Sequence, residues 1–196
     1  MIGSALDLDL DYSVGTALAF LGTLAALGVG HLFGDIVLQS DADAAGKGYP
    51  SNDRLAAGTH PWTGWPACLR HCASYLAAQA GALMIVLLVI PVTLPGIAAA
   101  LALSGSTHAV IDRRWLVQRI VARKGCSTWP QASFWVDQAL HWAAMLLAAV
   151  AAARITTITG AAGVTAAGLL LIADALRVER RHRRRVLSRP APSDRL

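Results

Sequence analysis

Three pairs of histidine and aspartate are the residues of this chain best suited to chemistry. They are His31 with Asp35, His108 with Asp112, and Asp137 with His141. The members of each pair are four positions apart, and in a helix this spacing places both side chains on one face, about one turn from each other. A further imidazole, His71, lies in another apolar segment. Each pair can therefore act as a unit toward a common ligand.

Imidazole and carboxylate together favour a divalent metal site. They are ligands of Zn, Mn, Fe and Ni, and metal sites in helix bundles are built from such pairs on facing helices. We expect Zn or Mn as the cofactor. The expected ligands are His31, Asp35, His71, His108, Asp112, Asp137 and His141. The expected catalytic carboxylates are Asp35, Asp112 and Asp137. The alternative is a buried hydrogen-bond network that holds no metal.

The composition indicates that the elements positioning these residues are membrane helices. Of the 196 residues, 55% are hydrophobic and 15% are charged, against about 25% charged in an average soluble domain. The mean hydropathy is +0.50. No Asp, Glu, Lys or Arg occurs in 12–34, 71–111, 138–153 or 155–173. Because roughly 20 apolar residues cross the hydrocarbon, and 71–111 is long enough for two crossings, the sequence predicts a polytopic all-α membrane protein.

We expect a bundle of about five transmembrane helices, forming one domain over residues 1–176. The expected helices are about 12–39, 66–90, 96–115, 134–153 and 155–176. Gly30 and Gly34 have the small-xxx-small spacing that lets two helices approach closely in lipid. Residues 177–196 are expected to form a basic cytoplasmic tail with a disordered end.

The basic residues predict the orientation of this bundle. With five helices, only Arg154 of the 17 Lys and Arg residues falls on the side that carries the N-terminus. The positive-inside rule then places the N-terminus outside and the C-terminus in the cytoplasm, which favours a bacterial inner membrane. All seven His and Asp residues fall in one layer near the cytoplasmic face. The tail is expected to contact anionic lipid headgroups rather than nucleic acid.

Two further patterns leave alternatives open. Residues 30–35 parallel residues 107–112, which is consistent with two repeated helical hairpins followed by one helix, or with chance. Cys68 and Cys72 flank His71 and are either soft ligands or, more simply, small apolar filler. Gln39 and Gln138 are candidates to hydrogen-bond the metal ligands. The sequence leaves a homo-oligomer open.

Several of these motifs as a set resemble a family of small bacterial and bacteriophage membrane proteins classed as a domain of unknown function. The motifs are His31-x3-Asp35-x3-Gln39, the segment 68–75 around His71, Thr107-His108 with Asp112-Arg113-Arg114, and Asp137-Gln138-x2-His141. The similarity covers about residues 28–145. It implies a polytopic inner-membrane protein and implies no particular activity.

Three functions are compatible with these patterns. The first is a metal-dependent hydrolase of a lipid or lipid-linked ester or phosphoester, with Arg113 and Arg114 as candidates to hold a headgroup, although their simpler role is to set the topology. The second is a non-enzymatic phage or mobile-element membrane factor whose polar layer locks the helices together. The third, an ion carrier, is disfavoured because nothing charged marks the outer half of the helices that carry the His and Asp residues.

Overall fold

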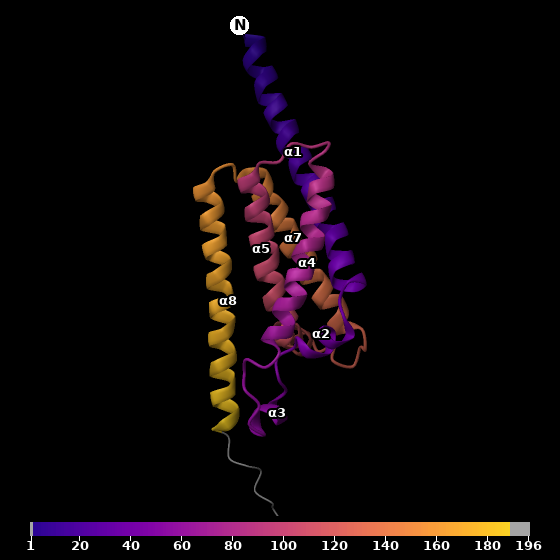
Figure 1. The fold of residues 1–196 in the computed structure, drawn as a ribbon, viewed down its shortest axis with the longest axis vertical. Helices are drawn as coiled ribbons and strands as arrows, with labels where there is room; N and C mark the ends of the chain where they lie inside the picture. The colour runs from indigo at the N-terminus through magenta and orange to yellow at the C-terminus, as the bar shows by residue number, and fades with distance from the viewer. Residues whose placement is uncertain (1, 189–196) are drawn as a thin grey trace, which may run out of the picture.

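The computed structural model describes the backbone of residues 2–188 and the side chains of residues 12–188, and within this range the chain is all-helical. The long helices are α1 (Ile2–Leu32), α4 (Trp65–Val86), α5 (Leu94–Asp112), α7 (Ala132–Arg154) and α8 (Ile158–Leu187). They lie side by side as an elongated bundle (Figure 1). The short helices are α2 (Asp41–Gly46), α3 (Asn52–Ala56) and α6 (Trp115–Arg123). The expected all-α bundle is confirmed.

Four helical stretches are long and apolar enough to cross a membrane. They are Tyr12–Val37, Leu94–Asp112, Ala132–Arg154 and Ile158–Leu187. We expected a fifth membrane span at α4. This helix is long enough, at 22 residues, but it is not among the four apolar stretches. Its hydropathy is lower because it contains polar residues, among them the buried His71 and Gln79. By helix length and composition the chain is a multi-pass membrane protein.

Three helix boundaries differ most from the sequence expectation, and the first is the start of α1, which begins at Ile2 instead of at about residue 12. Helix α1 gives way after Leu32 to a π-helical segment, η1 (Phe33–Val37), instead of continuing regularly to residue 39. Helix α8 runs past the expected end near residue 176 to Leu187, because Glu179 is buried there against Arg113 and holds the helix in place. The remaining part of the expected basic tail, residues 189–196, lies outside the described residues.

Two glycines, Gly30 in α1 and Gly34 in the following segment η1, allow the close approach to α4. A Cβ on Gly30 would lie 2.5 Å from the Cα of Gln79, and one on Gly34 would lie 2.8 Å from the Cα of Tyr75. Both neighbours are backbone atoms, which cannot move aside as a flexible side chain would. The small-xxx-small spacing therefore brings the end of α1 against α4, and with it His31 and Asp35 toward His71.

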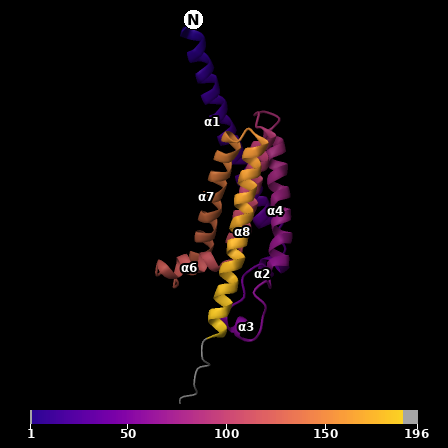
Figure 2. The ribbon, with the colours of Figure 1, turned by 90° about the vertical axis from the view of Figure 1, so that its left-hand side faces the viewer.

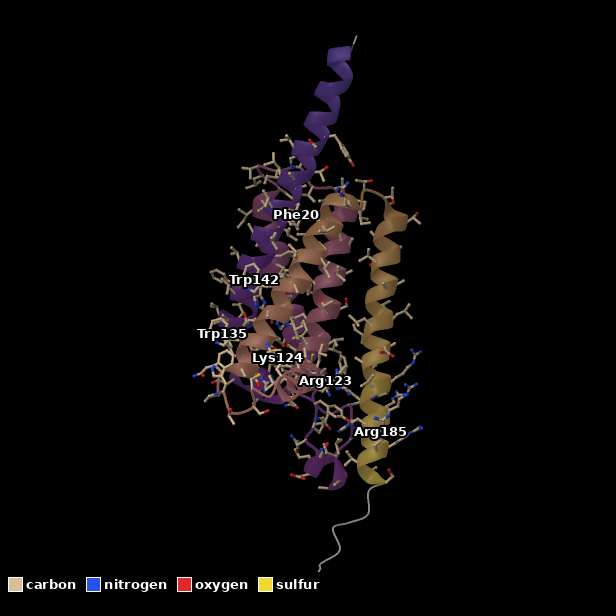
Figure 3. All side chains as sticks on the ribbon, turned by 180° about the vertical axis from the view of Figure 1, so that it is seen from behind. Phe20, Arg123, Lys124, Trp135, Trp142 and Arg185 are labelled. Atoms are coloured by element: carbon tan, nitrogen blue, oxygen red, sulfur yellow. The ribbon has the colours of Figure 1, made fainter. Side chains whose placement is uncertain are left out.

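The two ends of the bundle differ in their chemistry. The N-terminal part of α1 projects from one end, and helices α2 and α3 gather at the other (Figure 1). Helix α6 projects sideways at that second end (Figure 2). Arg123, Lys124 and Arg185 also lie toward this end, far from Phe20 (Figure 3). We call it the basic end. Away from it, a hydrophobic cluster between α1, α4, α5 and α7 includes Leu27, Leu83 and Met145.

Candidate metal centre

The four histidines converge in the bundle interior, as expected from the sequence. His31, His71, His108 and His141 come from α1, α4, α5 and α7, and each is at most 1% exposed. The ring centroids of His31 and His141 are 5.0 Å apart, those of His108 and His141 are 4.6 Å apart, and those of His71 and His108 are 5.0 Å apart. Four separate helices therefore contribute to one imidazole cluster.

The aspartates join this cluster in different ways. In α5, His108 Nε2 lies 3.1 Å from Asp112 Oδ2, and in α7, His141 Nδ1 lies 3.3 Å from Asp137 Oδ2, so both pairs keep the contact that their spacing predicts. Between His31 and Asp35 the helix changes to the π-helical turn of η1, which alters the relative direction of these two side chains. Asp35 instead contacts His71, with 3.0 Å between Asp35 Oδ1 and His71 Nε2. Such wide turns are rare and occur frequently at functional sites.

Four of these residues have the arrangement of a metal ligand set. Asp35, His71, His108 and Asp112 each offer one ligand atom, and these atoms all lie within 4.8 Å of one another. His71 Nε2 is 3.0 Å from His108 Nε2 and 3.4 Å from Asp112 Oδ2. In a tetrahedron with metal–ligand bonds of about 2.0–2.1 Å, neighbouring ligand atoms are about 3.3–3.4 Å apart. These two separations are therefore close to those that a tetrahedral ion requires.

A hydrogen-bond network satisfies these atoms poorly. His71 Nε2 faces Asp35 Oδ1, Asp112 Oδ2 and His108 Nε2 within 3.4 Å, yet a single N–H can serve only one of them well. Asp112 Oδ2 is buried and, despite its short distance to His108, has no partner with hydrogen-bond geometry among the described residues. A cation at the centre would contact all four groups at once.

Lys47 belongs to the site, although no sequence pattern marks it beyond its place in a polar loop. Helix α2 ends just before it, and its buried Nζ lies 2.8 Å from Asp112 Oδ1 and 3.3 Å from Asp35 Oδ1. Burial alone would lower the pKa of Lys47, but the carboxylates of Asp112 and Asp35 outweigh it and hold this pKa above its ordinary value. With Asp137, three carboxylates against one ammonium leave a net charge of −2 when the histidines are neutral.

A cleft of about 420 Å³ gives access to the carboxylate side of the cluster. Its walls include the three aspartates and also Lys47, Arg114, Gln39 and Gln138. None of the four histidines lines it, so the imidazoles form the rear of the site and the carboxylates its front. Of the three carboxylates, Asp137 is the most exposed, at 23% of its side chain.

His31 lies in the same layer but outside every group of residues close enough to share an ion in the described part of the chain. Its Nε2–H donates to Gln138 Oε1 at 3.0 Å, and its ring stacks on His141.

The imidazole of His108 is packed against Tyr75. The two rings stack with 3.7 Å between centroids, and the Tyr75 hydroxyl accepts a hydrogen bond from Gln79. These residues hold the rings in place, and nothing in their spacing marked Tyr75 or Gln79 as part of the site.

The two cysteines can reach the cluster. Cys68, Cys72 and Asp112 form another group whose ligand atoms lie within 4.8 Å of one another. Both thiols are buried, and Cys68 Sγ–H donates to the carbonyl oxygen of Ala109 at 3.5 Å. This geometry is compatible with both roles of these residues, as soft metal ligands and as small apolar side chains that fill space.

Arg113 is not available to hold a headgroup, which leaves Arg114 as the remaining candidate of the two. Arg113 is fully buried, pairs with Glu179 at 2.7 Å and donates to the carbonyl oxygens of four loop residues. The four are Lys47, Gly48, Pro61 and Thr63. Arg114 adopts a left-handed backbone, with φ of 64°, and this turn sends its side chain to the cleft instead. The sequence could not distinguish these adjacent arginines.

Comparisons of the chain with protein-family models and curated proteins, and of its structure with solved structures, found no match. The resemblance to small bacterial and phage membrane proteins therefore stays a prediction. Any function must follow from the geometry of the site.

Proposed function

We propose that this protein is a metal-dependent hydrolase that acts at the membrane on a lipid or lipid-linked ester or phosphoester. The observation that carries the proposal is the set of ligand atoms from Asp35, His71, His108 and Asp112 within 4.8 Å of one another, beside a cleft. Two imidazoles and two carboxylates suit Zn or Mn. A bound divalent ion polarises the scissile group and lowers the pKa of a water molecule that it binds.

The other residues of the cleft have separate roles in the proposed reaction. Asp35 and Asp112 belong to the ligand set, so Asp137 is the carboxylate left to act as general base. Arg114 lines the same cleft and supplies a cation for an anionic headgroup. Lys47 neutralises part of the carboxylate charge through its contacts with Asp35 and Asp112.

The basic end supports an assignment to the cytoplasmic face of a bacterial inner membrane, where anionic lipids are the expected partners. Arg180, Arg183 and Arg184 lie on one side of α8 and line a pocket of about 280 Å³ with Trp62 and His60. The guanidinium of Arg180 lies 4.9 Å from the ring centroid of Trp62. An amphipathic ring beside three cations suits the headgroup region of a bilayer.

A test of the enzyme proposal is hydrolysis of a lipid phosphomonoester in mixed micelles after loading the purified protein with Mn²⁺ or Zn²⁺. We expect turnover that chelator abolishes and that Asp112→Asn reduces by at least about 100-fold, the scale on which single catalytic groups act. Asp53→Asn on α3 is the matched control, because it removes a carboxylate outside the site. Equal rates in the Asp112 and Asp53 variants, or no dependence on metal, would contradict the proposal.

The competing candidate is a structural role without catalysis. Lys47 favours it, because its ammonium already pairs with two of the carboxylates. An ion-carrier role has less support, since the polar side chains buried beyond the layer among the described residues, Thr23, Gln79 and Ser104, are uncharged, and the core around them is apolar.

A further inference from the structure

We infer that the site holds two metal ions, bridged by Asp35, and that its substrate is an anionic phosphoester. This deepens the proposed function and rests on it. The first ion belongs to the four-ligand set described above. The second would be held by Asp35, Asp137 and His141, which also offer ligand atoms within 4.8 Å of one another.

Asp35 is common to the two ligand groups. A carboxylate has two oxygens and can give one to each of two neighbouring ions, as the bridging carboxylates of helix-bundle dimetal sites do. The turn of η1 places Asp35 between α4 and α7, so it faces His71 on one side and the pair of Asp137 and His141 on the other. No other aspartate among the described residues belongs to both a group with His71 and a group with His141.

The ring of His141 is oriented by the backbone carbonyl of Asp137, one turn earlier in α7. Its Nδ1–H donates to the carbonyl oxygen of Asp137 at 2.9 Å, and its Nε2 is buried with no hydrogen-bond partner among the described residues. Donation of one ring N–H to a carbonyl is the usual way in which a metal-binding histidine is oriented and its tautomer fixed. His71 and His108 also each keep one ring nitrogen without a partner, so the whole cluster is short of donors and acceptors.

The second position differs from the first in being open. Asp35 and Asp137 line the cleft, and three protein ligands leave at least one coordination position for water or substrate. Two divalent ions would change the net charge of the site from −2 to +2, before the guanidinium of Arg114 is counted. A cationic cleft favours an anionic phosphoester over a neutral carboxylic ester, and two-metal sites are typical of phosphoester hydrolysis. Asp137 is then a ligand instead of the general base.

The test is the metal content of Asp137→Asn beside wild type, after loading full-length protein in detergent with Mn²⁺ and removing free ions. We expect two ions per chain in wild type and one in Asp137→Asn, with two retained in the control Asp53→Asn. The electron paramagnetic resonance spectrum of wild type should show two exchange-coupled Mn²⁺ ions, and this readout holds even if the variant fails to fold. Inorganic phosphate should perturb that spectrum.

Three results would overturn the inference. One uncoupled ion in wild type that Asp137→Asn retains would remove the second position and leave the proposed hydrolase intact, with Asp137 as its base. Two ions in both proteins would place the second ion elsewhere. No bound ion in wild type would overturn the proposed function together with the inference.

Discussion

At the scale of single residues, the charge of Lys47 decides how the site behaves before metal binds. Its ammonium is the cation closest to Asp35 and Asp112, and burial makes both contacts strong in a way that exposed ion pairs are not. Because the folded-state pKa of Lys47 is raised, its contribution to stability is complete below the ordinary lysine value of 10.5 and is lost as the pH rises through the higher folded value.

Replacing Lys47 should therefore separate charge balance from metal binding. We expect Lys47→Met to destabilise the chelator-treated protein by about 3–5 kcal/mol, because two buried carboxylates lose their cation. Added Mn²⁺ should restore most of the loss by taking over that role. The measurement is the melting temperature in detergent at neutral pH, with and without Mn²⁺. A Lys47→Met protein as stable as wild type in chelator would show that the contacts of Lys47 with Asp35 and Asp112 contribute little to the free energy of unfolding.

The residues also show what sequence reasoning can reach. The contacts of His108 with Asp112 and of Asp137 with His141 follow from helical spacing alone. The same spacing misplaced the partner of Asp35, because the π-helical turn rotates it toward His71. Lys47 could not be found, since its contacts join a loop to two helices and no local periodicity records such a meeting.

At the scale of elements, the close approach of α1 to α4 positions Asp35. The all-helical class and the glycine spacing of this contact were predictable from composition and pattern. The partners of the buried Gln79 in α4 were harder to foresee, because its bonds to Leu27 of α1 and Ser104 of α5 join helices that are distant in the sequence. The extension of α8 likewise depends on a distant partner, Arg113.

A methyl group at the α1–α4 contact should disturb both packing and the site. We expect Gly30→Ala to cost about 1–3 kcal/mol, because its Cβ would press on the backbone of Gln79. The affinity of the site for metal should also fall, because Asp35 would move away from His71. The matched control is Gly81→Ala on α4, where a Cβ meets nothing within 4 Å and no loss is expected. Equal melting temperatures for the two variants would contradict this account of the interface.

At the scale of the whole molecule, Arg113 joins α5, α8 and the loop between α1 and α4. Its guanidinium pairs with Glu179 and caps four carbonyl oxygens of the loop, one of which belongs to Lys47. We expect Glu179→Ala to cost about 3–5 kcal/mol, since it leaves a buried guanidinium without its counter-charge. Proteolysis of the loop should then become faster than in wild type. A variant with unchanged melting and unchanged cleavage would contradict this role.

The division of basic residues between the two ends predicts the orientation in the membrane. In a chain freed of its native cysteines, Thr156→Cys between α7 and α8 should react with a membrane-impermeant thiol reagent in intact cells. Ala56→Cys at the basic end should react only after the membrane is opened. Helix α3 and the connection between α7 and α8 lie at opposite ends of the bundle (Figure 1). The reverse labelling pattern would invert the topology and move the cleft to the outer face.

The most direct test of the central claim is whether the His and Asp cluster binds a divalent ion in the folded bundle. Wild type and His108→Ala are stripped with chelator and melted in detergent with and without added Mn²⁺ or Zn²⁺, and their metal content is measured. The account predicts that metal raises the melting temperature of wild type, and that His108→Ala stays folded but neither retains metal nor responds to it. Wild type without bound metal, unmoved by either ion and destabilised by the substitution, would identify the cluster as a structural network and contradict the account.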